Sequence, residues 1–343
     1  MDFTGRDFLK ILDFSEEELS YMLATARKFK QLKHDGCNHK FFPNKNIVIV
    51  FEKTSTRTRC SFEVAGYDLG MGVTYLDPTG SQLGHKESIA DTAKVLSRFY
   101  DGIEFRGFAQ ETVDTLAENA SVPVWNGLTD YCHPTQALAD FMTLEEKVGR
   151  LKGLTLAFVG DAHNNVSNSL MAMSAKMGVN YIACGPNSLK PADDILRKCE
   201  SIAARNGCKI TVTDNIAELY GKVDAIYTDV WLSLGEDKEK WCERIALLKP
   251  YQVNMEMMNN MKPDTIFLHC LPAFHDLNTS VAREVGEKYG LKEMEVTNEV
   301  FESNKSVVFD QAENRMHTIK AVMFLSLWDP SSEKKSPDRG ESG

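Results

Sequence analysis

The segment FEKTSTRTRCSFE places hydroxyl side chains and an arginine at the point where a predicted strand feeds into a helix. Ser55, Thr56, Arg57 and Thr58 fall in the first turn of that helix. A helix amino terminus offers unpaired N–H groups and a partial positive charge, while hydroxyls add donors and an arginine adds a planar charged fork. Together these groups predict a phosphate site. The segment alone does not separate this interpretation from a capped helix with surface arginines.

Further cationic and amide side chains stand where a strand ends or a helix begins. Arg106 lies in GIEFRGF, and Arg315 follows VVFDQ, a run interpreted as a strand. His133 and Gln136 lie in HPTQ at the start of a helix. A single histidine before a proline is usually a turn residue or a satisfied core residue, so the combination of these groups carries the prediction of an anion site.

A second set of polar residues follows the strands predicted in the later half of the chain. The segments GDAHNN, TDVWLSLGED and HCLPAFHD place on one sheet edge Asn164, Asn165, Asp229, Ser233 and Cys270. That edge is the usual ligand side of a parallel sheet. An aspartate and an asparagine there can hold the ammonium and carboxylate of an amino acid. Taken singly each could be a turn former, which is how Asn164 and Asp237 are interpreted.

An alternation of strands and helices brings these groups together. Residues 46–51 form an unbroken apolar run, typical of a strand buried on both faces of a parallel sheet, and a helix follows from Thr56. The same pattern recurs from GLTLAFVGD through TIFLHCLP to AENRMHTIKAVMFLSL. It predicts an α/β fold in which helices cover both faces of mainly parallel, doubly wound sheets. Ser15 is predicted to cap an earlier helix whose buried face comprises Leu19, Met22, Leu23, Ala26 and Phe29.

The length of 343 residues predicts two domains with a cleft between them. The first is expected over residues 1–148, ending with a helix from about 135, and the second over residues 149–312. Periodicity leaves open which domain a final helix, about 313–328, packs against. Residues 329–343 are polar and rich in turn formers, so a disordered tail is expected there.

Composition narrows the function classes. The chain is 43% hydrophobic and 26% charged, without an apolar run long enough to span a bilayer. Its formal charge of -10 argues against nucleic acid as a partner and requires local cations for any anionic substrate. The amino terminus resembles neither a secretory signal nor a transit segment, and the eight cysteines contain no CxxC pair. We therefore expect a cytoplasmic protein with reduced thiols.

Three ordered motifs carry a family resemblance: Ser-Thr-Arg-Thr-Arg at 55–59, His-Pro-Thr-Gln at 133–136 and His-Cys-Leu-Pro at 269–272. Together they resemble the ornithine carbamoyltransferases of the aspartate/ornithine carbamoyltransferase family, and the similarity runs from about residue 8 to 327. The stretches GSQLGHKES, VPVWNGLTD and FDQAENRMHTIKAVM are also more similar to this group than to its aspartate-using relatives.

The resemblance implies an activity and a set of site residues. The enzyme would move the carbamoyl group of carbamoyl phosphate onto the side-chain amine of L-ornithine, with no cofactor and no metal. Carbamoyl phosphate would be bound by Ser55, Thr56, Arg57, Thr58, Gln82, Arg106, His133, Gln136, Cys270, Leu271 and Arg315. Ornithine would be bound by Asn165, Asp229, Ser233 and Leu234. The catalytic residues among them would be Arg57, Arg106, His133, Cys270 and Arg315.

The resemblance also implies an assembly and a fold. Family members form homotrimers, and Gln82 would reach in from a neighbouring subunit; larger assemblies of trimers stay open. The last helix would return to the first of two α/β lobes. One departure is Leu234, where the family has methionine; a backbone contact does not depend on the side chain, so little change is expected in binding. The less flexible side chain could still alter how the loop closes.

Rival interpretations leave specific features unused. Putrescine lacks the carboxylate that Asn165 would contact, and aspartate would need further cations in the second domain. A dinucleotide site would need a glycine spacing that VGDAHNN lacks, and an inactive scaffold has no use for so many converging charges. A metal at His34, Cys37 and His39 lacks a fourth ligand nearby.

The direction of the reaction, toward arginine synthesis or toward ornithine in the arginine deiminase pathway, stays open.

Overall fold

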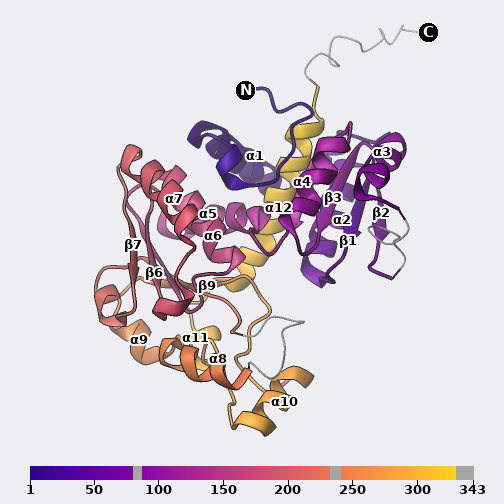
Figure 1. Cartoon of the computed structure of the whole chain (residues 1–343). Coiled ribbons are helices and arrows are strands. Elements are labelled where there is room, and N and C mark those ends of the chain that lie inside the picture. Colours follow the sequence, from indigo (N-terminus) through magenta and orange to yellow (C-terminus); the bar gives the residue numbers. More distant parts are fainter. Residues whose placement is uncertain (80–86, 232–240, 330–343) are drawn as a thin grey trace, which may run out of the picture.

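Two parallel sheets flanked by helices make up the protein (Figure 1). The computed structural model describes residues 1–79, 87–231 and 241–329, so Gln82, Ser233, Leu234 and residues 330–343 of the expected tail lie outside the described residues. The predicted fold class, two doubly wound α/β halves, is confirmed. Within the described ranges, no helix has the length and apolar character needed to cross a lipid bilayer.

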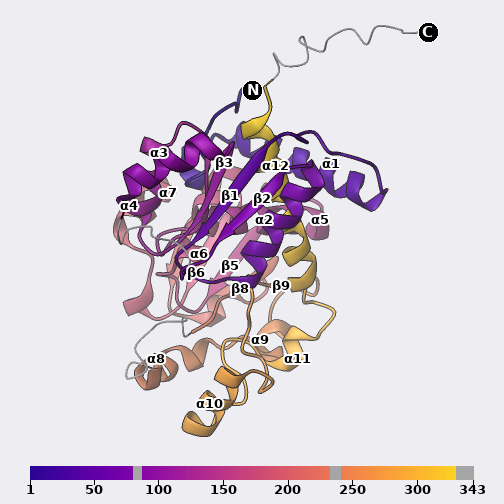
Figure 2. The same cartoon turned by 90° about the vertical axis from the view of Figure 1, so that its right-hand side faces the viewer.

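The first sheet has the strand order β2-β1-β3-β4, and all its neighbours are parallel. Its strands are β1 (Asn46–Phe51), β2 (Gly72–Leu76), β3 (Gly102–Arg106) and β4 (Val124–Leu128). Figure 2 shows β1, β2 and β3 running side by side. All of β1 after Asn46 is buried, as its unbroken apolar run predicts. Its carboxyl end leads directly toward the helix that starts at Thr56.

The helices of this half follow their sequence signals closely. They are α1 (Glu16–His34), α2 (Thr56–Leu69), α3 (Ile89–Phe99), α4 (Gln110–Asn119) and α5 (Pro134–Val148), with a 3-10 turn η1 (Ile11–Asp13) before them. Ser15 and Glu18 form a capping box at the start of α1, and the predicted buried face of α1 is confirmed. Pro134 begins α5, and Gly149 ends it with a φ of 79° that favours glycine.

The second sheet has the order β7-β6-β5-β8-β9, again with parallel neighbours. Its strands are β5 (Thr155–Val159), β6 (Asn180–Cys184), β7 (Ile210–Thr213), β8 (Ala225–Thr228) and β9 (Ile266–His269). Around it lie α6 (Asn165–Met177), α7 (Asp193–Arg205), α8 (Trp241–Leu248), α9 (Met255–Asn259), α10 (Ser280–Tyr289) and α11 (Asn298–Phe301), with 3-10 turns η2 (Asn187–Leu189), η3 (Ile216–Leu219) and η5 (Lys249–Tyr251).

The last helix, α12 (Val308–Leu327), begins earlier than its sequence pattern predicts. The run VVFDQ was expected to be a strand, and this expectation is wrong, because Val308 to Gln311 form the first helical turn. The β-branched run does mark a short extended stretch: Ser306 pairs with Phe267 of β9 as an isolated parallel bridge. The helical period of the residues that follow then extends back through Val308, which is buried in the core.

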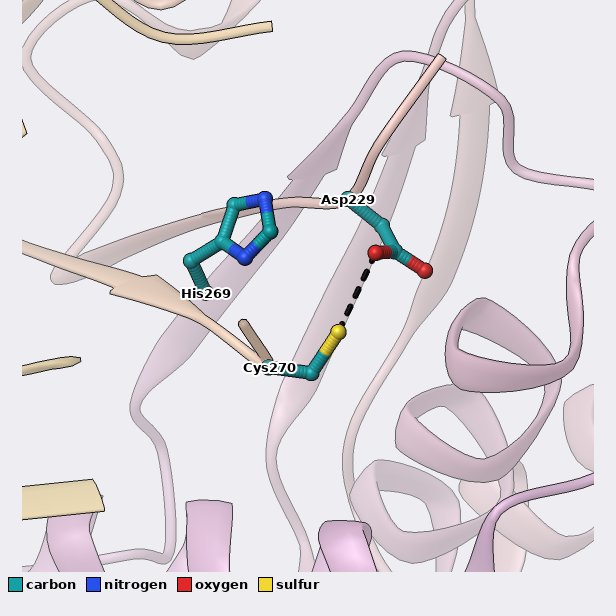
Figure 3. A group of neighbouring side chains, drawn as sticks. All are labelled: Asp229, His269 and Cys270. Atoms are coloured by element: carbon teal, nitrogen blue, oxygen red, sulfur yellow. Dashed lines mark hydrogen bonds between the residues drawn. The ribbon is translucent and has the colours of Figure 1, made fainter. Parts of the chain in front are cut away.

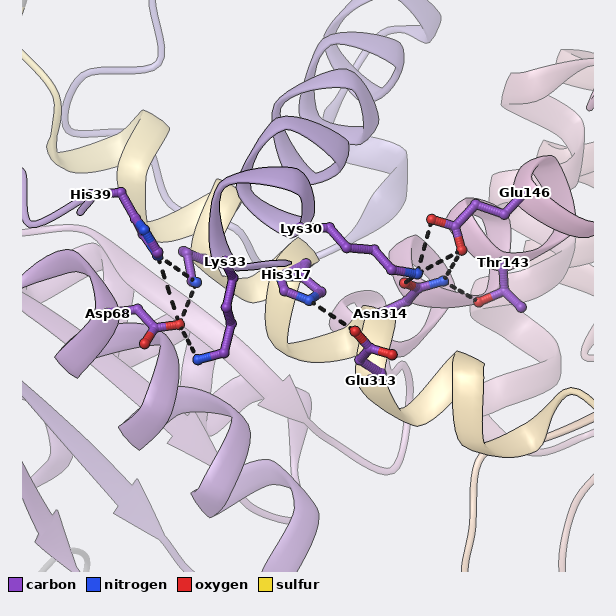
Figure 4. A network of polar contacts seen from close by, with 10 residues as sticks. Lys30, Lys33, His39, Asp68, Thr143, Glu146, Glu313, Asn314 and His317 are labelled. Atoms are coloured by element: carbon purple, nitrogen blue, oxygen red, sulfur yellow. Dashed lines mark hydrogen bonds and ion pairs between the residues drawn. The ribbon is translucent and has the colours of Figure 1, made fainter. Parts of the chain in front are cut away.

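Buried polar contacts attach α12 to α1, α2 and α5 of the first half (Figure 4). Asn314 donates to Thr143 on α5 at 2.9 Å and accepts from Lys30 on α1 at 2.8 Å. Further along α12, the fully buried Lys320 pairs with Asp68 on α2. A buried cation without its partner is costly, so this ion pair specifies where the helix packs. As a result α12 can deliver Arg315 from the end of the chain to the residues of the first half.

Candidate active site

A cavity of about 500 Å³ has walls from both halves of the molecule. The predicted site residues that line it are Ser55, Thr56, Arg57, Arg106, His133, Asn165, Asp229, Cys270, Leu271 and Arg315. Thr58 and Gln136 are buried and are not part of this lining. Gln82, Ser233 and Leu234 lie outside the described residues. The structure thus gathers groups from widely separated stretches of the chain into one hollow.

The start of α2 forms one part of the cavity wall. Ser55 is the residue that caps α2, and its hydroxyl accepts the N–H of Thr58 at 3.3 Å. The remaining N–H groups of the first turn have no partner within the helix, and the helix dipole makes this end attractive to anions. Arg57 stands on the same turn and is half-buried. The predicted strand, turn and helix unit is therefore present, with its anion-binding end at the cavity.

Thr58 connects this turn to two arginines. Its hydroxyl oxygen accepts from Nη1 of Arg106 at 3.2 Å and from Nη2 of Arg315 at 2.7 Å. Arg106 is at the end of β3 and also donates through Nε to the carbonyl of Lys53 at 3.2 Å. Hydrogen bonds from charged donors are stronger than neutral ones, so these contacts orient both guanidinium groups. Thr58 therefore fixes Arg106 and Arg315, two of the cations that line the cavity, without reaching the lining itself.

The three arginines form a concentrated positive charge, as their effects on one another's pKa show. Burial, followed by repulsion from Arg106 and Arg57, lowers the pKa of Arg315 to about 9. Burial likewise lowers the pKa of Arg106 to about 10, while Glu104 raises it. Cationic groups that depress each other's pKa in this way gain stability when an anion arrives. The wall is therefore suited to a ligand with more than one negative charge.

His133 stands at the start of α5 and lines the cavity together with these cations. It is 4% exposed, and its backbone N–H donates to Ser169 Oγ on α6 at 2.8 Å. Burial, followed by the charges of Arg315, Arg106 and Arg57, lowers the pKa of His133 well below its usual value. The imidazole is consequently neutral near pH 7 and can donate one hydrogen bond without carrying charge.

The opposite wall carries Asp229 and Cys270 at the ends of β8 and β9. The Cys270 thiol donates to Asp229 Oδ1 at 3.1 Å (Figure 3). Burial, followed by the negative charge of Asp229, raises the pKa of Cys270 well above its usual value. The thiol therefore stays protonated, which excludes a resting thiolate nucleophile. Leu271, the next residue, has a φ of 59°, a conformation that costs energy outside glycine and that occurs often at functional sites.

The metal-ligating potential of this corner is limited by His269. The ligand atoms of Asp229, His269 and Cys270 lie within 4.8 Å of one another. However, Nδ1 of His269 accepts the N–H of Leu271 at 2.8 Å, and Nε2 lies 3.3 Å from Glu295 Oε1. Both ring nitrogens thus face protein groups, and the thiol is protonated. The donor set as it stands does not favour a metal ion.

Two asparagines at the start of α6 have different partners. Asn164 caps the helix through Ser167 N at 2.8 Å, and its Nδ2 donates to Asp229 Oδ2 at 3.2 Å. The capping contact agrees with its interpretation as a turn residue. Asn165 lines the cavity, and its Nδ2 donates to the carbonyl of Thr129 at 2.6 Å. This bond joins the second half of the chain to the loop that precedes His133.

Some lining residues were not found by sequence reasoning. Lys53 lines the cavity beside Ser55, and its Nζ lies 3.9 Å from Asp130. Its position directly before the hydroxyl-rich turn was the signal that could have identified it. Phe274, in the loop after β9, and Thr279 and Val281, at the start of α10, also line the cavity. Phe274 belongs to the segment HCLPAFHD, but its apolar side chain gave no sign of a binding role, and no motif marked Thr279 or Val281.

Comparisons with known proteins agree with this geometry. The carbamoyl-P binding domain of the aspartate/ornithine carbamoyltransferases matches residues 6–146, and the Asp/Orn binding domain of the same family matches residues 152–326. The chain is similar to "Ornithine carbamoyltransferase, catabolic" of Treponema denticola, at 61% identity over 94% of this chain and 96% of that protein. It is also similar to an ornithine carbamoyltransferase of Staphylococcus aureus, at 54% identity over 94% and 98% of the two chains.

A solved structure extends the likeness to three dimensions. The ornithine carbamoyltransferase from Pyrococcus furiosus superposes with a TM-score of 0.88 at 41% identity, covering 95% of this chain and 98% of that chain. Both domain matches, the identities and the fold lead to one assignment. The chain belongs to the aspartate/ornithine carbamoyltransferase family.

Proposed function

We propose that this chain transfers the carbamoyl group of carbamoyl phosphate to the side-chain amine of L-ornithine, giving L-citrulline and phosphate. One observation carries the proposal: a wall of three arginines and a wall with Asp229 and Cys270 face the same cavity. The first wall suits a dianion, and the second suits an amine. The relatives named ornithine carbamoyltransferase support ornithine as the acceptor.

The anionic substrate occupies the first wall. The phosphate contacts the start of α2, through Ser55, Thr56, Arg57 and Thr58, and Arg106 at the end of β3. The carbamoyl end contacts His133, Gln136, Cys270, Leu271 and Arg315, and Gln82 is supplied by a neighbouring subunit. Because Thr58 and Gln136 are buried before substrate arrives, their direct contacts require a local rearrangement.

The amino acid occupies the opposite wall. Asn165, Asp229, Ser233 and the backbone of Leu234 hold the α-carboxylate and α-ammonium of ornithine. The bond from Asn165 to Thr129 must then be exchanged for a bond to the substrate, or its second amide proton must be used.

Catalysis is electrostatic. The neutral amine attacks the carbonyl carbon, the C–O bond to the phosphate breaks, and the surplus proton of the attacking nitrogen passes to the departing phosphate. Negative charge develops on the carbonyl oxygen and on that phosphate. His133, Arg106 and Arg57 stabilise that charge as fixed donors, with ~3 kcal/mol per donor in comparable sites. Carbamoyl phosphate is already activated, so the reaction requires neither a metal nor an organic cofactor.

The amine of ornithine must lose a proton before it attacks. Cys270 lies beside that amine and acts by its position, because a protonated thiol is not a strong base, so the proton passes to solvent. The adjacent arginines favour the neutral amine, since positive charge nearby disfavours an ammonium group.

The proposal extends to organisation and location. Residues 1–148 with α12 form the carbamoyl-phosphate domain, and residues 149–312 form the ornithine domain. The protein acts in the cytoplasm as a homotrimer, in which Gln82 serves the active site of a neighbouring subunit. Light scattering of the purified chain tests the assembly: a mass of one or two copies contradicts it.

Initial rates with three acceptors test the activity. Ornithine, putrescine and aspartate are supplied in parallel with carbamoyl phosphate, and the carbamoylated product is quantified. Ornithine is expected to react at least a hundredfold faster than either rival. Equal rates with putrescine contradict a role for the α-carboxylate, and faster reaction with aspartate assigns the chain to the other branch of the family.

A further inference from the structure

A buried carboxylate lies behind the cavity and has no role in the mechanism described so far. Asp140 lies on α5, one turn after Gln136, and is fully buried. Its Oδ1 accepts from Nε2 of Gln136 at 2.8 Å and from Nε2 of Gln311 at 2.6 Å. Gln311 belongs to α12, so a single oxygen atom on α5 joins that helix to the last helix of the structure.

Gln311 extends this contact into the second sheet. Its Oε1 accepts the backbone N–H of His269 at 3.1 Å, and its Nε2 also donates to the hydroxyl of Tyr227 at 3.1 Å. Tyr227 is on β8, and His269 is the last residue of β9, immediately before Cys270. An unbroken run of hydrogen bonds therefore leads from Gln136, beside the anion wall, to the strand end that carries Cys270.

Burial makes the loss of any hydrogen bond in this run costly. Gln136, Asp140, Gln311, Tyr227 and His269 are all at most 2% exposed. Water therefore does not replace a bond that is lost, and a buried donor left unpaired is costly. Among the described residues, the second carboxylate oxygen of Asp140 has no hydrogen-bond partner. Oδ1 of the carboxyl group is thus held by the amides of Gln136 and Gln311.

The contact also determines how the amide of Gln136 is turned. An oxygen that accepts from both amides requires the NH₂ group of Gln136 to face Asp140. The carbonyl oxygen Oε1 of Gln136 is then the end of the amide that remains for a ligand, and an acceptor is what the NH₂ of a carbamoyl group needs. With the amide turned the other way, two oxygens would face each other.

We propose that Asp140 is a positioning residue for carbamoyl transfer: it orients the Gln136 amide for the carbamoyl group and, through Gln311, ties that amide to the strand end before Cys270. This inference rests on the proposed function for the identity of the ligand. It predicts that a change at Gln311, which does not line the cavity, alters the handling of carbamoyl phosphate.

The first test is Gln311→Met, which preserves volume and removes the links to Asp140 and His269. The expected result is a KM for carbamoyl phosphate at least fivefold higher than in the wild type, with the KM for ornithine less affected. A purely structural role would lower Tm and leave both KM values unchanged. The matched control is Thr143→Val, which removes the neighbouring buried α5–α12 bond from Asn314 and is expected to keep both KM values within twofold.

A double-mutant cycle tests the connection directly. Gln136→Met, Gln311→Met and the double variant are compared by kcat/KM for carbamoyl phosphate. If the run of hydrogen bonds acts as a unit, the double variant is within threefold of Gln136→Met alone. Effects that multiply overturn the inference, as does a Gln311→Met variant with wild-type kinetics.

Two variants of Asp140 test the role of its oxygen. Asp140→Asn, which keeps an acceptor at Oδ1, is expected to retain most of the kcat/KM that Asp140→Ala loses.

Failure of the proposed function is distinguishable from failure of this inference. If the wild type forms no citrulline, the proposed function is wrong, and calorimetric titration of carbamoyl phosphate into the wild type and Gln311→Met still measures the coupling. Equal affinities for the two proteins overturn the role of Asp140. A weaker affinity in Gln311→Met, with Thr143→Val unchanged, supports it.

Discussion

Arg315 donates to the hydroxyl of Thr58 at 2.7 Å, although 257 positions separate the two residues. The bond fixes a cation from the last helix against the turn that begins α2. Since Arg106 donates to the same oxygen, one hydroxyl sets the spacing of two guanidinium groups in the anion wall. The positions of Arg106 and Arg315 in the site therefore depend on their contacts with Thr58. The sequence segments that contain these residues do not reveal such contacts.

Replacing Thr58 tests this arrangement. Thr58→Val removes the acceptor of two charge-assisted hydrogen bonds, each worth about 1.5–3 kcal/mol, so kcat/KM for carbamoyl phosphate is expected to fall about a hundredfold. Steady-state citrulline formation measures the loss. Thr265→Val is the control, because Thr265 is equally buried, makes one hydrogen bond to Val223 and is not part of the cavity lining. A Thr58→Val enzyme with unchanged kinetics contradicts the role of the hydroxyl.

The neutral state of His133 predicts a pH dependence of stability. Its folded pKa lies below the ordinary value of 6.5, so the unfolded chain takes up the proton first as pH falls. Stability from this residue is therefore full above pH 6.5 and declines below it, by at most about 1.4 kcal/mol per pH unit. Urea unfolding at pH 7 and pH 5 should show a smaller decline for His133→Asn than for the wild type. Equal declines would mean that His133 is charged in the folded protein.

Glu104 is expected to make the protein less stable as pH rises, which is the opposite pH dependence to that of His133. Its carboxylate is buried against Gly127, burial raises its pKa well above the ordinary 4.5, and within the described residues neither oxygen has a hydrogen-bond partner. The unfolded chain ionises first as pH rises, so this residue lowers stability progressively above pH 4.5, up to its folded pKa. Glu104→Gln should therefore raise Tm more at pH 8 than at pH 5. Thermal melts with the same increment at both values would count against a raised pKa.

Cys270 is expected to act as a protonated group. Cys270→Ser should lower kcat about tenfold, the equivalent of ~1.4 kcal/mol, because a hydroxyl has a shorter reach to Asp229 and the attacking amine. The pH profile of kcat should also shift, since the thiol influences the protonation of that amine. Cys242→Ser, at an exposed cysteine, is the control. Unchanged turnover together with an unchanged pH profile would remove Cys270 from the mechanism.

The fold class could be predicted because its strands and helices carry local sequence patterns. The residues in these patterns are the ones that the folded chain buries or uses as helix caps. The apolar run of β1 and the capping box of α1 are local signals, and both were confirmed. The prediction of a strand at VVFDQ was wrong. Its two valines favour a strand, but tertiary packing makes the run the start of α12. A local pattern cannot report which of two structures the rest of the chain will bury.

The site was predicted as a set of residues, and its internal contacts were not. Motifs identified Arg57, His133 and Cys270, whereas the shared hydroxyl of Thr58 and the buried carboxylate of Asp140 depend on contacts between distant elements. Such contacts have no sequence spacing of their own. Lys53 was missed for a different reason, because a lysine beside a strand end resembles an ordinary surface residue.

Citrulline formation by Arg57→Gln, beside the matched variant Arg59→Gln, tests the central claim most directly. Arg57 lines the cavity, while Arg59, two residues on, is exposed and pairs with Glu63 at 3.0 Å. The account predicts that Arg57→Gln lowers kcat/KM for carbamoyl phosphate by at least a hundredfold and that Arg59→Gln stays within threefold of the wild type. Wild-type kcat/KM in Arg57→Gln would contradict an anion site built on these arginines.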